Sequence, residues 1–172
     1  THTHTHIHIQ THTHIHTYLH TYIHDLIAFP IYTYTRSREC ACLNDVCWLD
    51  VKAEAKDMVF CPGIYTASFR IMLINPSGFR NHPVCLLLDT SDGQHAEAER
   101  FLEGDQLRCG TVAPLRPVGG GWLDLDAGEF SVDTETPLTV SFSLRGVEGE
   151  WWKSGLVVDC AKIQLSSAIQ RG

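Results

Sequence analysis

The sequence predicts an all-β protein, a jelly-roll-like β-sandwich preceded by a low-complexity N-terminal segment. Apolar and polar residues alternate with a period of two in several stretches after about residue 40. Turn-forming groups such as Cys-Pro-Gly, Asn-Pro-Ser-Gly and Ser-Asp-Gly separate these stretches. Only one short stretch has the composition of a helix, which favours a sandwich or jelly roll over a mixed fold.

The N-terminal strip THTHTHIHIQTHTHIHTYLHTYIH alternates threonine and histidine. A strand with this pattern would place its histidines on one face, where imidazoles could bind zinc, copper or nickel. A translated AC dinucleotide repeat explains the alternation as well, because ACA encodes Thr and CAC encodes His, and it also explains the exceptions as single-base changes. We therefore expect residues 1–38 to be a disordered repeat outside the folded domain, without a specific metal site.

The rest of the chain, residues 39–168, is near the usual size of one domain, with a tail at 169–172. The sequence has 13 Lys and Arg against 20 Asp and Glu, for a net charge of −7. This acidic balance argues against nucleic acid as a partner, and the apolar runs are too short for a membrane span. The seven cysteines are an odd number without a C-x-x-C pair, so we expect reduced thiols in a cytoplasmic or nuclear protein and no cofactor.

The predicted elements follow in chain order. Alternation places Leu49, Val51 and Ala53 on one face of the first strand and the charged residues between them on the other. Apolar residues recur with the same period in the second and fifth strands, and the third strand reads as fully buried. AEAERFLEGD is the only plausible helix. We expect strands at 46–55, 64–74, 83–90, 119–130, 137–146 and 154–165, and a short helix at 96–105.

Several carboxylates raise the question of catalysis. Asp124, Asp126, Glu129 and Glu148 could supply the two carboxyl groups of a glycosidase. Acidic residues that alternate with apolar ones are, however, typical of the solvent face of a strand. The sequence shows neither a Gly-x-Ser-x-Gly elbow nor a phosphate-binding loop. We therefore predict no catalytic residues and a protein that is not an enzyme.

Four stretches between Asn44 and Leu165 carry a resemblance to a known family: NDVCWLDVKAEA, PGIYTASFRIML, GGWLDLDAGEF and WWKSGLVVDCAKIQL, in this order. They resemble the blocks of the phloem protein 2 (Nictaba-type) plant lectins. The resemblance implies a jelly-roll-like β-sandwich that binds N-acetylglucosamine oligomers or N-glycans in the cytoplasm or nucleus. In many members an F-box precedes the lectin domain and recruits ubiquitin-ligase components. The residues that match the blocks, and are expected to be structural, are Trp48, Trp122, Trp152, Lys153, Ser154 and Gly155.

The chain also departs from this family. In the family the domain begins earlier, with a tryptophan-rich segment, and the repeat strip stands in that place here. A glutamate that the family commonly has before its Trp-Lys-Ser-Gly block matches Gly146. The chain thus resembles an N-terminally truncated member. Two functions stay open, a glycan-binding module and a non-binding remnant or protein-interaction sandwich that has lost its sugar site.

The stretch VEGEWWKSG contains the groups that a sugar site needs. Such sites stack an aromatic ring on the pyranose and bind its hydroxyls through carboxylates or amides. We predict Trp151, Glu148 and Glu150 as the carbohydrate-binding residues, although Trp151 could instead cover a sandwich edge. Because neighbours on a strand point in opposite directions, we expect Trp152 to lie in the core.

Overall fold

The computed structural model describes residues 6–10, 16–21, 40–43, 46, 48–80, 82–103, 113–146 and 152–168. All the regular elements in these ranges are strands, and the same ranges contain no helix that could span a membrane. The strands are β1 His6–Gln10, β2 His16–Thr21, β3 Ala41–Cys42, β4 Leu49–Val59, β5 Gly63–Ser77, β6 Val84–Thr90, β7 His95–Arg100, β8 Leu115–Gly119, β9 Trp122–Val132, β10 Pro137–Gly146 and β11 Ser154–Ala168.

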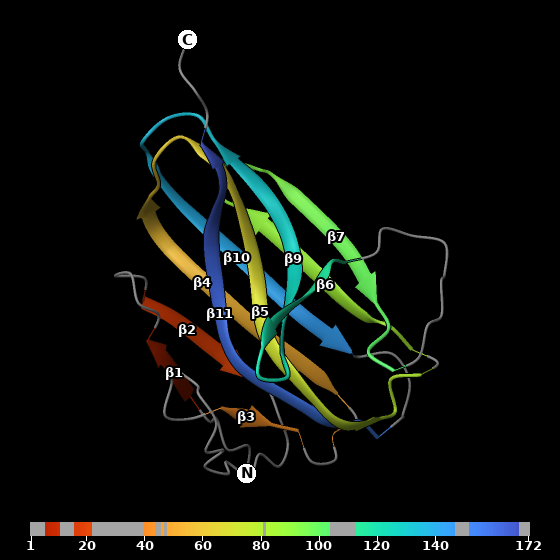
Figure 1. The fold of residues 1–172 in the computed structure, drawn as a ribbon. Coiled ribbons are helices and arrows are strands. Elements are labelled where there is room, and N and C mark those ends of the chain that lie inside the picture. Colours follow the sequence, from red (N-terminus) through yellow and green to blue (C-terminus); the bar gives the residue numbers. More distant parts are fainter. Residues whose placement is uncertain are drawn as a thin grey trace.

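The strands form two antiparallel sheets that pack face to face (Figure 1). The first sheet has the order β1-β2-β4-β10-β6-β7, and the second has the order β3-β11-β5-β9-β8. Strands that are distant in the sequence therefore lie side by side, such as β4 beside β10 and β5 beside β11. The predicted all-β sandwich is confirmed.

The core lies between the sheets and follows the predicted alternation. Leu49, Val51 and Ala53 of β4 are buried, and the charged residues between them are more exposed. The inward residues of β5 and β10 meet those of β4 in one hydrophobic cluster. An example is the contact between the rings of Phe69 and Phe142, whose centroids are 5.0 Å apart. Burial of these apolar side chains is the main force that holds the two sheets together.

The predicted helix at 96–105 is wrong. Residues 95–100 form β7, the edge strand of the first sheet, which pairs with β6. Ala96 and Ala98 pack against the core, whereas Glu97 and Glu99 are exposed. The alternation of small apolar and charged residues thus outweighs the helix propensity of Ala, Glu and Arg. Residues 104 and 105 lie outside the described ranges.

The N-terminal strip takes part in the first sheet, against expectation. β1 and β2 form an antiparallel pair, in which His6 is opposite His20. β2 joins the edge of β4 through two residue pairs, His20 with Lys52 and Thr21 with Val51. The expectation that the strip contributes no strand is therefore wrong for β1 and β2. The division of the chain near residue 39 stays a prediction.

Candidate functional site

Two exposed tryptophans lie at the end of the sandwich where β4 and β11 begin and β10 ends (lower right in Figure 1). Trp48 directly precedes β4, and 68% of its surface is exposed. Trp152 lies two residues before β11 and is 65% exposed. Large aromatic side chains usually bury most of their surface, so two such indoles at one end of a domain mark a candidate binding surface.

The expectation that Trp152 lies in the core is wrong, and Lys153 occupies the inward position instead. Lys153 is only 1% exposed. Because consecutive residues in extended chain point to opposite sides, an inward Lys153 places Trp152 outward. Trp48 was also expected to be structural, because it matches a family block. It is exposed, so it does not pack in the core.

Backbone pairing brings the two tryptophans to the same end. The amide of Val46 donates to the carbonyl oxygen of Lys153 at 2.9 Å, and the amide of Lys153 donates to Val46 at 2.7 Å. Trp152 is the neighbour of Lys153, and Trp48 is two residues from Val46. Leu49, the next residue after Trp48, pairs with Gly146 at the end of β10. Both indoles therefore neighbour residues that pair at this end of the sandwich, Trp152 beside Lys153 and Trp48 beside Leu49.

The stem of Lys153 lies beneath Gly146. A Cβ atom at position 146 would be 3.3 Å from Cε of Lys153 and 3.4 Å from Cβ of Leu49. Little room is left for a side chain at this position. Gly146, which stands where the phloem protein 2 lectins commonly have a glutamate, thus leaves room for the buried side chain of Lys153.

The predicted carbohydrate-binding residues Glu148, Glu150 and Trp151 lie outside the described residues. The described chain resumes at Trp152, and it stops before them at Gly146. Their role in binding stays a prediction. In the sequence they lie between Gly146, the last residue of β10, and Trp152.

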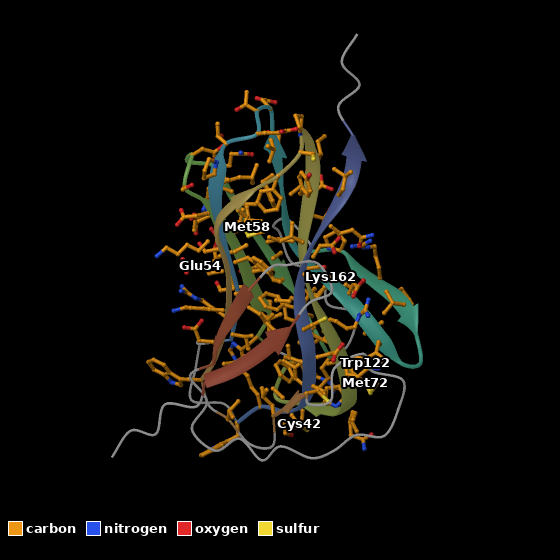
Figure 2. All side chains as sticks on the ribbon, turned by 90° about the vertical axis from the view of Figure 1, so that its left-hand side faces the viewer. Cys42, Glu54, Met58, Met72, Trp122 and Lys162 are labelled. Carbon is orange, nitrogen blue, oxygen red and sulfur yellow. The ribbon has the colours of Figure 1, made fainter. Side chains whose placement is uncertain are left out.

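Trp122 has a packing role, as expected from its position in a family block. It is 5% exposed and forms a small cluster with Cys40 and Val157 on the outer face of the second sheet. Figure 2 shows Trp122 beside Met72 and near Cys42. This cluster lies outside the main core and is closed to a stacking sugar.

Ser154 and Gly155 are the first residues of β11, where the strand expected at 154–165 also begins. Gly155 has a φ of 82°, and the register of β11 on β5 shifts at this point. The left-handed conformation favours glycine and marks a bulge within the strand.

Asp124 and Asp126 of β9 are buried, which corrects the expectation that they form a solvent face, whereas Glu129 of the same strand is exposed as expected. Asp124 is 2% exposed and forms ion pairs with Arg70 of β5 and Lys162 of β11. Asp126 accepts a hydrogen bond from Arg116 of β8 at 2.6 Å, and this bond raises the pKa of Arg116. Both carboxylates are thus engaged in charge-assisted bonds that tie four neighbouring strands together.

Comparison with known proteins identifies the family. The model of the phloem protein 2 family matches residues 24–165. The chain therefore belongs to the phloem protein 2 family, and the resemblance found in the sequence is confirmed. The match begins within the N-terminal strip, which the sequence alone had placed outside the domain.

Two curated relatives show the extent of the similarity. The chain is 31% identical over 137 residues to a lectin of Luffa acutangula, covering 78% of this chain and 59% of the relative. It is 29% identical over 134 residues to "F-box protein PP2-A15" of Arabidopsis thaliana, covering 69% of this chain and 43% of that protein. The chain thus spans about half the length of these relatives.

A solved structure, that of TmCBM61 in complex with beta-1,4-galactotriose, matches with a TM-score of 0.44 and 10% identity. The match covers 87% of this chain and 88% of that one.

Proposed function

We propose that this chain is a lectin-type module that binds N-acetylglucosamine oligomers or N-glycans at the end of the sandwich carrying Trp48 and Trp152. Membership of the phloem protein 2 family and the similarity to a lectin support a carbohydrate ligand. The observation that carries the proposal is the exposure of two indoles at one end of the fold.

The chemistry of this end suits a sugar. An indole offers a flat apolar surface on which the apolar face of a pyranose can stack, and its N–H can donate a hydrogen bond. Glu148 and Glu150, which shortly precede Trp152 in the sequence, would accept hydrogen bonds from sugar hydroxyls, and Trp151 would add a third ring. No catalytic step is part of this proposal.

We also propose a cellular setting. The second relative carries an F-box in its name, which supports a role for this domain, in longer chains, as the recognition part of an adaptor for ubiquitin-ligase components. Its ligands would then be glycoproteins that reach the cytoplasm or nucleus.

Calorimetric titration with N-acetylglucosamine oligomers, together with an array of N-glycans, tests the proposal. We expect the wild-type chain to bind, and Trp48→Ala and Trp152→Ala each to weaken binding by about tenfold, the value of one stacked aromatic contact of about 1.4 kcal/mol. Val59→Ala is the matched control, since Val59 is an exposed apolar residue at the far end of β4, about 30 Å away.

Two outcomes would contradict this function. The first is a wild-type chain that is folded by circular dichroism and binds none of these glycans, which would favour a protein-interaction sandwich. The second is a pair of tryptophan variants whose affinity equals that of Val59→Ala, which would place the sugar elsewhere on the molecule.

A further inference from the structure

Gly78, just after β5, lies in direct contact with the backbone of Trp152. A Cβ atom at Gly78 would be 2.1 Å from the carbonyl oxygen of Trp152 and 3.1 Å from Cα of Lys153. Gly78 also has a φ of 84°, in the left-handed region that favours glycine. Both the conformation and the space at this position therefore require a residue without a side chain.

The amide of Lys153 belongs to the same peptide group as the Trp152 carbonyl and points to the other side, where it donates to Val46 at 2.7 Å. The carbonyl oxygen of Lys153 in turn accepts from the amide of Val46 at 2.9 Å. A second close approach lies just beyond it, where a Cβ atom at Gly155 would be 2.3 Å from the carbonyl oxygen of Ile74. The backbone that carries Trp152 is thus enclosed by the end of β5 on one side and by Val46 on the other.

Backbone contacts determine the position of the Trp152 side chain more than usual, because its indole is exposed. A buried side chain is held in place by the residues packed around it. The Trp152 side chain has few such neighbours, since about two thirds of its surface is open. Its position is therefore set mainly by where its own main chain lies, and a Cβ atom at Gly78 would collide with the carbonyl oxygen of that main chain.

We propose that Gly78 is a positioning residue of the binding site, which sets the place of the Trp152 indole and through it the affinity for sugar. The part that concerns affinity rests on the proposed function. The part that concerns the indole does not, because it can be measured without a ligand. A methyl group at position 78 would have to push the Trp152 carbonyl away by roughly 1 Å to reach ordinary van der Waals contact.

The chain offers a matched control for the strain of a left-handed alanine. Gly93 has a φ of 94°, and a Cβ atom there would meet nothing within 4 Å. Gly78→Ala and Gly93→Ala therefore share the conformational cost, and only the first adds the contact with Trp152. Gly78→Asn is a second variant, since asparagine tolerates the left-handed region better while its Cβ makes the same contact.

The experiment labels the full chain with 5-fluorotryptophan, so that each indole gives a fluorine resonance, and assigns the Trp152 resonance by its loss in Trp152→Phe. We expect Gly78→Ala and Gly78→Asn to shift the Trp152 resonance and to leave that of buried Trp122 in place. We expect Gly93→Ala to shift neither. In titrations with N-acetylglucosamine oligomers, both Gly78 variants should bind up to about tenfold more weakly than Gly93→Ala, the loss of one stacked contact.

The two readouts separate the possible failures. A Trp152 resonance that stays in place in folded Gly78→Asn overturns the positioning role. A shifted resonance with the affinity of Gly93→Ala overturns the link between position and binding. Absence of glycan binding by the wild-type chain overturns the proposed function and with it this link, while the resonance still decides whether Gly78 positions the indole.

Discussion

The thiol of Cys160 lies within a charged part of β11. It follows Asp159 in sequence and is opposite Arg70 of β5 in the sheet register. Burial, followed by the negative charge of Asp159, raises the pKa of Cys160 from 9.0 to about 12, although Arg70 acts in the other direction. The folded protein therefore keeps this thiol protonated at pH values where an unfolded chain releases the proton.

This difference predicts a loss of stability at high pH. Between pH 9 and 12 the unfolded state binds fewer protons at Cys160 than the folded state, so the free energy of unfolding falls as the pH rises. We expect Cys160→Ala to show a smaller decline over this range than the wild-type chain. Urea unfolding at a series of pH values measures it, and the comparison of the two proteins cancels the titration of other groups. Parallel curves for the two proteins would argue against the high pKa.

The packing of β7 on β9 depends on small residues at their contact. A Cβ atom at Gly128 of β9 would be 2.8 Å from Cβ of Ala96 in β7 and 3.3 Å from Cβ of Leu88 in β6. Gly128 also lies where the register of β9 on β5 shifts. The two sheets approach each other closely at this point because neither Gly128 nor Ala96 has a large side chain.

We expect Gly128→Ala to destabilise the fold by about 1–3 kcal/mol, the usual cost of overpacking a core. The double variant Gly128→Ala with Ala96→Gly removes the methyl group that the new side chain meets. Its loss of stability should therefore be smaller than the sum of the two single losses. Chemical denaturation of the four proteins measures this coupling. Strictly additive losses would show that the contact with Ala96 is not the cause.

The elements show what could be predicted from the sequence. Period-two alternation was sufficient for the sandwich and for the inward faces of β4, β5 and β10, because apolar residues recur at every second position of these strands. The central part of β5 also buries Thr66 and Ser68 on its other face. β8 was missed because LRPVG, with Pro117 and Gly119, does not have the composition of a strand. It forms at the sheet edge, where a strand needs a partner on one side only.

The candidate site was predicted less completely. The burial expected for Trp152 was wrong, because its indole is 65% exposed, and the binding role of Glu148, Glu150 and Trp151 stays a prediction. The orientation of Trp152 depends on Val46 and Gly78, which are distant in the sequence. Alternation within one strand carries no information about such contacts.

At the scale of the whole molecule, the N-terminal hairpin is attached at one edge of the first sheet. Two residue pairs join β2 to β4 among the residues that the structure describes, and a two-stranded hairpin alone contributes little stability. The main hydrophobic cluster of the described side chains consists of residues between Ala41 and Ala161. The folded domain is therefore expected to be independent of the first strands.

We predict that deletion of residues 1–21 changes the free energy of unfolding by less than about 1 kcal/mol. The affinity for N-acetylglucosamine oligomers should also stay unchanged, because the described pairs of β2 with β4 stop at Val51, three residues from Trp48. Thermal melting followed by circular dichroism, together with calorimetry, measures both. Loss of cooperative melting in the shortened chain would show that the hairpin belongs to the folding unit.

Val46 pairs with Lys153, which directly precedes β11, and Leu49 pairs with Gly146 of β10, so that this short stretch is bonded to both layers of the sandwich. Each layer consequently supplies one indole, Trp48 ahead of β4 and Trp152 ahead of β11. An oligosaccharide that stacks on both rings would connect the two sheets at this end of the sandwich. The oligosaccharide would then have to leave one ring before the two sheets could separate. The force needed to unfold the protein by pulling the sheets apart should therefore be higher with the ligand bound than without it.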